Sequence, residues 1–182
     1  MRVIEHRRHS MRNKPDQHLS QAGVDLARSV GADLGRFDLV VTSTLPRAFE
    51  TAIAMGFAVD EQLEELCSLP DGFEAVVQWD EGFARFSEVM KSNPHGVVAM
   101  FGQKLAQLHR EIAARLPDHG RALVISHGGI VEASVVGCMP SESFSSWGRA
   151  CDYCEGVRMF FNGTDCERAE LMRVLGRGSV ST

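Results

Sequence analysis

The chain has 182 residues, 44% hydrophobic and 24% charged, which excludes a disordered protein and favours a single globular domain. No apolar run approaches the roughly 18 residues that cross a bilayer, and charged residues follow Met1 at once, so we expect a cytoplasmic protein without a signal peptide or membrane partner. The net charge of −5 argues against a general nucleic-acid binder. Basic residues are concentrated in residues 1–18, which carry five of the 19 Lys and Arg but two of the 24 Asp and Glu.

The first half of the chain predicts two strands and two helices. Residues 2–8 predict a strand that turns polar toward its end, and an apolar stripe at helical spacing predicts a helix from residue 21 to a stop at Gly35. Residues 37–42 (FDLVVT) predict a second strand, and Pro46 is placed to open the next helix. Residues 60–95 are rich in acids and broken by Pro and Gly, so we expect a small helical insertion there.

The second half of the chain continues the alternation. A long helix is predicted over residues 96–116, a buried strand over 122–126 (ALVIS) and a short apolar helix over 130–137. Two further strands are predicted over 156–161 and 170–175, joined by an Asn-Gly turn. Strands that alternate with helices indicate an α/β fold, a three-layer α/β/α sandwich around a mostly parallel central sheet, formed by the whole chain as one domain.

Polar residues follow three of the predicted strands. They are Arg8 and His9, the segment from Ser43 to Arg47, and residues 126–128 (SHG). Because the carboxyl ends of parallel strands meet at one edge of a sheet, we expect these residues to converge there. Each alone is more often structural than functional. Together, two histidines, several arginines and a glycine pair opening a helix predict a site for an anionic group, most plausibly a phosphoryl group.

The five cysteines are an odd number in a chain without an export signal, so we expect reduced thiols. Cys151 and Cys154 have the C-x-x-C spacing of a redox pair or of half a zinc site. No second pair at close spacing completes such a zinc site, so metal or redox function is the minor alternative.

Four motifs, in order along the chain, resemble those of one family. Residues 8–10 (RHS) match an Arg-His-Gly motif, and residues 19–23 (LSQAG) match Leu-Thr-x-x-Gly. Residues 43–52 (STLPRAFETA) match Ser-Pro-Leu-x-Arg-Ala-x-x-Thr-Ala except at Thr44, and residues 126–129 (SHGG) match a second His-Gly-Gly segment. The sequence therefore resembles the histidine phosphatase superfamily, with the phosphoglycerate-mutase-like fold.

The resemblance implies that His9 attacks phosphorus and becomes a phosphohistidine, with His127 as the second catalytic histidine. Such chemistry suits a neutral imidazole, which is nucleophilic near pH 7, and guanidinium groups, which bind phosphate oxygens in forked pairs. It needs no metal and no cofactor. The residues expected to bind the phosphate are Arg8, Ser10, Arg12, Arg47 and Gly128.

The family's general acid is a glutamate in a Leu-x-Glu segment, and residues 63–65 match it with Glu65 as the proton donor. Glu64, Asp71 and Glu74 are alternatives in the same acid-rich stretch. Members of the family that act on phosphohistidine manage without this acid, because their leaving group is already good.

Four departures from the family pattern bear on the expected activity. Ser10 replaces the motif glycine, so that its side chain either crowds the loop or adds a hydrogen bond to phosphate, and Pro15 replaces an asparagine common in mutases. Arg7 replaces an apolar residue and is expected to point away from the site. Only 38 residues separate His9 from Arg47, which leaves little room for the capping segments of mutases.

We therefore predict a metal-independent phosphatase that acts on a phosphorylated small molecule or a phosphoprotein. The alternatives are a phosphoglycerate-mutase-type phosphotransferase and a phosphate-binding member of the fold without turnover. Neither the substrate nor the oligomeric state follows from the sequence.

Overall fold

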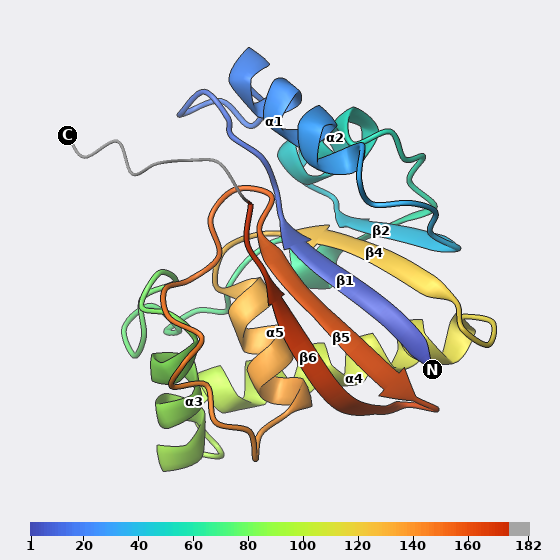
Figure 1. Ribbon diagram of the computed structural model, residues 1–182. Coiled ribbons are helices and arrows are strands. Elements are labelled where there is room, and N and C mark those ends of the chain that lie inside the picture. The colour runs from blue at the N-terminus through green and yellow to red at the C-terminus, as the bar shows by residue number, and fades with distance from the viewer. Residues whose placement is uncertain (175–182) are drawn as a thin grey trace.

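The computed structural model describes residues 1–174, and a six-stranded sheet in the order β3-β2-β4-β1-β5-β6 forms its middle layer (Figure 1). β2 pairs in parallel with β3 and β4, and β4 pairs in parallel with β1. β5 runs antiparallel to both of its neighbours, β1 and β6. The mostly parallel sheet is thus confirmed. The strands are β1 (Arg2–Arg8), β2 (Leu39–Ser43), β3 (Glu61–Leu63), β4 (Arg121–Ser126), β5 (Gly156–Asn162) and β6 (Asp165–Met172).

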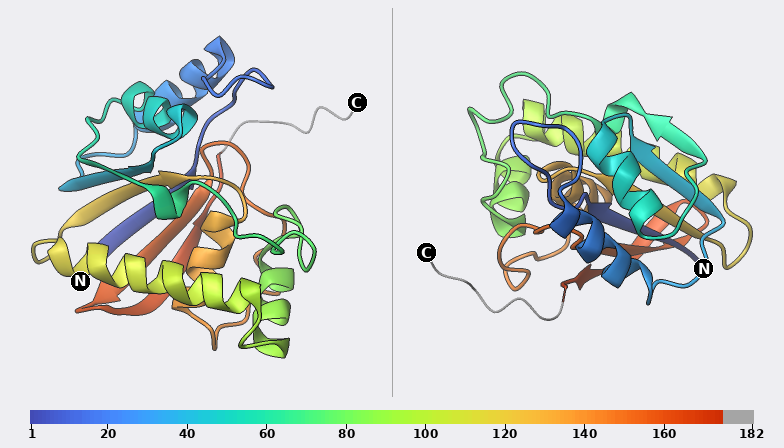
Figure 2. Two further views of the ribbon diagram at one scale, coloured as in Figure 1. Left: turned by 180° about the vertical axis from the view of Figure 1, so that it is seen from behind. Right: turned by 90° about the horizontal axis from the view of Figure 1, so that it is seen from above.

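Helices cover both faces of the sheet, which confirms the three-layer α/β/α sandwich (Figures 1 and 2). β4 supplies the core on both sides, because Val124 packs in the larger hydrophobic cluster with α3–α5, whereas its neighbours Leu123 and Ile125 pack in the smaller cluster with α1 and α2. None of the helices within residues 1–174 is both long and apolar enough to cross a membrane. The helices are α1 (Gln21–Gly31) and α2 (Pro46–Ala54) on one face, and α3 (Phe83–Ser92), α4 (Val97–Arg115) and α5 (Ile130–Cys138) on the other.

Two predicted boundaries were wrong, and one strand was not predicted. α1 ends at Gly31, and Gly35 instead adopts a φ of 71° at the end of the turn that follows. Residues 60–95 contain two short helices, a 3₁₀ helix, η1 (Glu64–Leu66), and α3, as expected, but they also contain β3, a three-residue edge strand that was not predicted because two of its three residues are polar. β6 begins at Asp165 rather than at residue 170. The prediction missed its first residues because they are polar and mostly exposed, and the predicted end at Leu175 lies outside the described residues.

Cys67, Cys138, Cys151 and Cys166 carry free thiols, in agreement with the expectation of reduced cysteines. Cys151 is buried in the larger hydrophobic cluster and Cys154 in the smaller one. The C-x-x-C pair is therefore divided between the two cores of the protein.

Candidate active site

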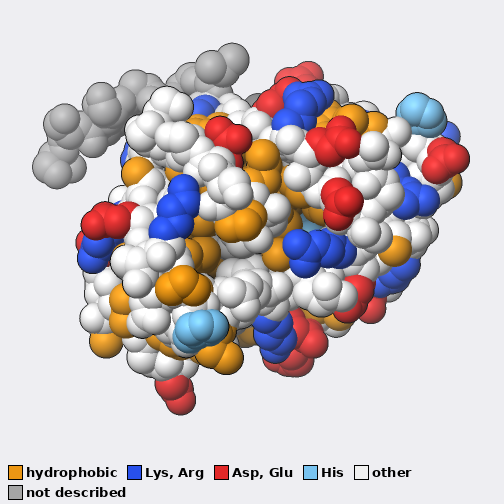
Figure 3. Space-filling view, turned by 90° about the horizontal axis from the view of Figure 1, so that it is seen from below, with side chains coloured by type: hydrophobic (Ala, Val, Ile, Leu, Met, Phe, Trp, Pro, Cys, Tyr) orange, Lys and Arg blue, Asp and Glu red, His pale blue; other side chains and the backbone are white. Residues whose placement is uncertain are grey.

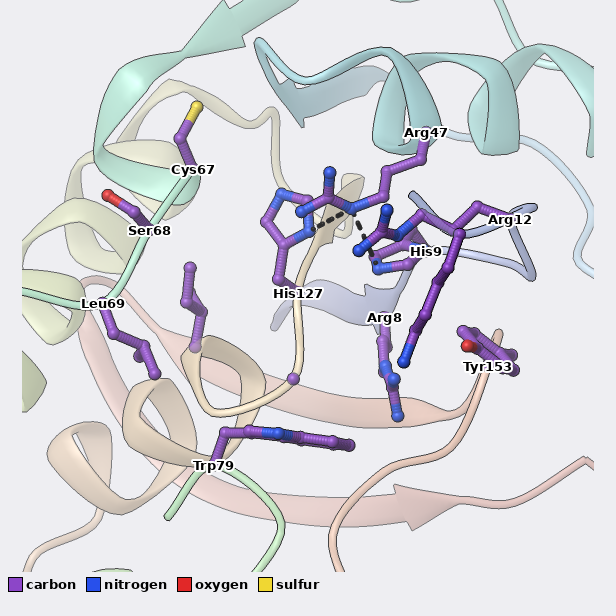
Figure 4. A pocket seen from close by; sticks show the side chains of 13 residues that line it. Arg8, His9, Arg12, Arg47, Cys67, Ser68, Leu69, Trp79, His127 and Tyr153 are labelled. Carbon is purple, nitrogen blue, oxygen red and sulfur yellow. Dashed lines mark hydrogen bonds between the residues drawn. The ribbon is translucent and has the colours of Figure 1, made fainter. Parts of the chain in front are cut away.

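A cleft of about 260 Å³ opens at the carboxyl edge of the parallel strands, where β1, β2 and β4 end (Figure 4). Segments that are far apart in the sequence meet there, because the register aligns Arg8 at the end of β1 with Ser126 at the end of β4. The sheet topology thus brings the strand-end residues together, as predicted. The cleft is lined by Arg8, His9, Arg12, Lys14, Arg47, Cys67, Ser68, Leu69, Trp79, His127, Gly128, Ile130 and Tyr153.

His9 follows β1 directly and is 6% exposed. Its backbone N–H donates to Ser126 O at 2.9 Å, which ties it to the end of β4. Its Nδ1 lies 2.6 Å from Ser10 O, and since a carbonyl oxygen only accepts, Nδ1 carries the proton. The lone pair is therefore on Nε2.

Arg47, in the first turn of α2, joins the two histidines of the cleft. Its Nε lies 3.2 Å from His9 Nε2 and 3.2 Å from His127 Nδ1, and Figure 4 shows the guanidinium between the two rings. Because the guanidinium only donates, His127 Nδ1 is an acceptor, and His127 Nε2 donates to Ser43 Oγ at 2.8 Å. The strand ends and the helix start thus determine the tautomers of both histidines.

The environment keeps both imidazoles neutral. Burial, and then the charges of Arg47, Arg8 and Arg12, lower the pKa of His9 to about 3. Burial, His9 and the same arginines lower the pKa of His127 to about 2. A neutral imidazole is a nucleophile at its unprotonated nitrogen, so the geometry supplies one at Nε2 of His9 across the neutral pH range.

Arg8 is held by aromatic rings on two sides. Its guanidinium carbon lies 4.6 Å from the ring centroid of Trp79 and 4.6 Å from that of Tyr153 (Figure 4). Its Nη1 donates to Cys151 O at 2.9 Å, whereas its Nε is buried and has no hydrogen-bond partner among the described residues. A buried donor without a partner is costly.

The glycine pair at the start of α5 makes room for this arrangement. A Cβ on Gly128 would lie 2.5 Å from Cε3 of Trp79, so only glycine lets the indole approach. Gly129 adopts a φ of 81°, and its N–H donates to Glu132 Oε2 at 2.7 Å. Glu132 Oε1 also accepts from Cys151 N at 2.7 Å, so one buried carboxylate joins the helix start to the loop that carries Tyr153.

The structure brings six of the eight residues predicted for the site to the cleft: Arg8, His9, Arg12, Arg47, His127 and Gly128. Ser10 is instead fully buried beneath it, because its hydroxyl donates to Gly23 O at 2.7 Å and its N–H donates to Thr51 Oγ1 at 2.9 Å. Glu65 is exposed on η1 and does not line the cleft. Arg7, as expected, points elsewhere and bonds to Glu5 and to Cys154 O.

Sequence reasoning missed the aromatic walls of the cleft and Lys14. Trp79 and Tyr153 lie in irregular segments with no motif, although Tyr153 is the sole tyrosine of the chain. Within residues 1–174, no group of three or more His, Cys, Asp or Glu side chains is placed to hold a metal ion.

Comparison with known proteins places this geometry in a family. Among solved structures, phosphoserine phosphatase from Entamoeba histolytica, in complex with 3-phosphoglyceric acid, superposes with a TM-score of 0.70 at 19% identity, over 96% of this chain and 98% of that one. Phosphoglycerate mutase from Bacillus anthracis str. Sterne gives 0.64 at 15% identity over 94% and 92%, and a mycobacterial glucosyl-3-phosphoglycerate phosphatase gives 0.56 at 22% identity over 93% and 96%. At these identities the likeness shows a shared fold.

No curated protein matches the chain. The sequence model of the histidine phosphatase superfamily (branch 1) matches residues 4–169, which include every residue that lines the cleft and all or most of each strand of the sheet. The fold, the paired histidines and this match agree, and the chain is an enzyme of the histidine phosphatase superfamily, branch 1.

Proposed function

We propose that this protein is a phosphatase that hydrolyses a phosphorylated small molecule through a phosphohistidine formed on His9 Nε2. The observation that carries the proposal is the neutral His9, whose proton is held on Nδ1 by Ser10 O so that Nε2 faces a cleft with three arginines. The neighbours of the same fold include phosphatases for phosphoserine and for glucosyl-3-phosphoglycerate, which supports a small substrate.

In the first step, the lone pair of His9 Nε2 forms a bond to phosphorus while the bond from phosphorus to the leaving oxygen breaks. Arg8, Arg12 and Arg47 would bind the phosphoryl oxygens through their guanidinium groups. The phosphate charge would favour a proton on His127, opposing the arginine field that lowers its pKa. In the second step, water attacks phosphorus, inorganic phosphate leaves, and the lone pair returns to Nε2.

The leaving oxygen of an alkyl phosphate requires a proton, and none of the described cleft-lining residues is a carboxylic acid. The family motif assigns this role to Glu65. Of the two adjacent glutamates, Glu64 lies nearer, because its Oε1 accepts from Thr44 Oγ1 at 3.0 Å, and Thr44 also contacts the cleft residue Cys67. We therefore propose Glu64 ahead of Glu65 as the proton donor.

The first test is hydrolysis of p-nitrophenyl phosphate between about pH 5 and 8, without added metal. We expect phosphate release, inhibition by vanadate, and loss of activity in His9→Ala by roughly a thousandfold or more, because the covalent step is removed. The absence of hydrolysis would leave a phosphate-binding protein without turnover. Surviving activity in His9→Ala would show that another residue is the nucleophile.

A phosphoglycerate-mutase-type transfer is the second candidate. A mutase returns the phosphoryl group to a bound acceptor, so the phosphoenzyme must be shielded from water. Only residues 67–82, between η1 and α3, and residues 139–155, between α5 and β5, are available to cover the cleft, so rapid hydrolysis is the expected fate of the phosphoenzyme. Isomerised phosphoglycerate instead of released phosphate would favour the mutase.

A further inference from the structure

Three polar side chains form a hydrogen-bonded network inside the protein, between α4 and the sheet. His109 Nε2 lies 3.1 Å from His6 Nδ1, and His6 Nε2 lies 2.6 Å from Ser126 Oγ. Other histidine side chains appear on the molecular surface, where water surrounds them (Figure 3). All three members of the buried network are instead 0% exposed. The reaction at His9 uses neither His6 nor His109, so their presence in the core needs another explanation.

The buried network has one direction, which α4 determines. His109 Nδ1 lies 2.7 Å from Leu105 O, one turn earlier on α4, and a carbonyl oxygen only accepts, so Nδ1 carries the proton. His109 Nε2 is therefore an acceptor, and His6 Nδ1 donates to it. His6 Nε2 is in turn the acceptor for the hydroxyl of Ser126. Each hydrogen thus points from β4 toward α4.

Ser126 connects the buried network to the active site. It is the last residue of β4, and its carbonyl accepts from the backbone N–H of His9 at 2.9 Å. The next residue of the chain is His127, which precedes the start of α5. A single residue thus joins the backbone of both catalytic histidines, and its side chain is held from the core.

Stability alone does not account for two histidines in this place. Ile4, two residues earlier on the same side of β1, packs in the larger hydrophobic cluster, so the surroundings of His6 also suit an apolar side chain. Replacement of a buried hydrogen-bonded pair by apolar groups of similar shape is often neutral or stabilising. Hydrogen bonds differ from apolar contacts in that they are directional, and a fully satisfied buried network holds its members in one orientation.

We propose that His6 and His109 are positioning residues, which act through the Ser126 hydroxyl to hold the end of β4 in the orientation that places His9 and His127 for reaction. The proposal rests on the proposed function, because it takes His9 as the nucleophile.

The arginines of the cleft have other supports. Arg8 donates to Cys151 O and Arg47 donates to Gln17 Oε1, so neither depends on the buried network for these contacts. We therefore expect loss of the network to impair phosphoryl transfer more than binding of the phosphate.

Two amide variants of His109 form a matched pair for kinetics. The amide of glutamine reaches the place of Nε2 in histidine, whereas that of asparagine reaches the place of Nδ1. His109→Gln thus keeps an acceptor for His6, but His109→Asn keeps only the donor to Leu105 O. With p-nitrophenyl phosphate, we expect kcat to fall roughly ten- to hundredfold in His109→Asn and less than about threefold in His109→Gln, with KM nearly unchanged in both, because a small displacement of a reacting group is costly.

Two further variants separate positioning from stability. Ile112→Ala makes a cavity at a buried position on the same helix without breaking a hydrogen bond, so it should lower Tm and leave kcat unchanged. Ser126→Ala breaks the buried network at its other end. Its loss of kcat and that of His109→Asn should not add in the double variant, because both changes act through the same contacts. Circular dichroism would confirm that each variant is folded at the assay temperature.

Nitrogen NMR of the histidine rings tests the proposal without turnover. We expect the ring proton on Nδ1 of His6, His9 and His109 and on Nε2 of His127. The ring signals of His9 and His127 should shift in His109→Asn and change much less in His109→Gln and in Ile112→Ala.

Equal kcat in the two amide variants of His109 would overturn the positioning role, because the acceptor for His6 would not matter. Additive losses in the double variant would also overturn it, as would ring signals of His9 and His127 that do not move in His109→Asn. If the unmodified protein hydrolyses no phosphate ester, the proposed phosphatase is refuted. Ring shifts confined to His109→Asn would still support the positioning role in that case.

Discussion

The guanidinium of Arg8 is the most constrained cation of the cleft. Trp79 and Tyr153 cover its two sides, Cys151 O takes one of its N–H groups, and Gly128 leaves the space that Trp79 occupies. Such an arrangement fixes the plane of the guanidinium before any ligand arrives. A preorganised donor binds a phosphoryl group without the cost of ordering a flexible side chain.

Replacement of Trp79 tests this view. Trp79→Leu removes the π face beside Arg8, and a cation–π contact of about 0.5 to 2 kcal/mol corresponds to a fall in kcat/KM of roughly 2- to 30-fold. Trp79→Phe keeps an aromatic face and should lose less. Trp147→Leu, at the other tryptophan, is the matched control and should change thermal stability rather than kcat/KM. Equal losses in the leucine and phenylalanine variants of Trp79 would show that only bulk matters.

At the scale of elements, the short pair β3 and η1 determines which acid approaches the cleft. β3 pairs with β2 through Ser43 and Leu63, so the two residues that follow these positions, Thr44 and Glu64, come together. Glu65, the next residue of the 3₁₀ turn, is exposed like Glu64 but makes no hydrogen bond to Thr44. The family motif therefore indicates Glu65 as the proton donor, whereas the strand pairing favours the preceding residue, Glu64.

The adjacent glutamates form a matched pair for testing the proton donor. Glu64→Gln should slow alkyl phosphates by about a hundredfold and aryl phosphates by less than tenfold, because an aryl leaving group departs without a proton. Glu65→Gln should affect both substrates little. The reverse result, with the selective loss in Glu65→Gln, would return the role to the residue that the motif indicates.

The sequence predicted the elements that present the histidines, because β1, β2 and β4 each end in a polar residue and Pro46 marks the start of α2. It did not predict the walls of the cleft. The contacts of Trp79 and Tyr153 with Arg8 depend on the paths of two irregular segments, which carry no periodicity. Ser10 was misplaced for a related reason: its orientation follows from hydrogen bonds to Gly23 and Thr51, which only the folded chain brings near.

At the scale of the whole molecule, buried histidines link stability to pH. His6, His9, His109 and His127 are each at most 7% exposed, and burial is the main cause that lowers the pKa of each one, to about 4 for His109 and well below the ordinary value for His6. His6 and His109 share a hydrogen bond of 3.1 Å, and His6 Nε2 accepts from Ser126 Oγ, so neutral rings satisfy this network.

These shifts predict a loss of stability on mild acidification. Below about pH 6.5 the unfolded chain binds protons at these histidines while the folded protein does not, so each can lower the free energy of unfolding by up to about 1.4 kcal/mol per pH unit. Glu132, whose pKa burial raises, and His18, whose pKa is raised by its hydrogen bond to Glu50, act in the opposite direction but are two groups against four. We expect Tm to fall steeply between pH 7 and 5.

Thermal unfolding monitored by circular dichroism would measure this dependence. His109→Gln should make the slope of Tm against pH shallower, whereas His95→Gln, at an exposed position, should leave it unchanged. A Tm that stays constant between pH 7 and 5 would contradict the prediction.

The shared hydrogen bond of Arg47 has a consequence for chemical reactivity. Because its Nε donates to His9 Nε2, the lone pair of the proposed nucleophile is already engaged when the cleft is empty. A phosphoryl oxygen is a stronger acceptor than an imidazole nitrogen, so an arriving anion competes for this hydrogen and releases the lone pair. Uncharged electrophiles, which offer no such acceptor, would meet an occupied nitrogen. The cleft would thus favour anionic substrates already by controlling whether the lone pair of His9 Nε2 is available, before the leaving group contacts the protein.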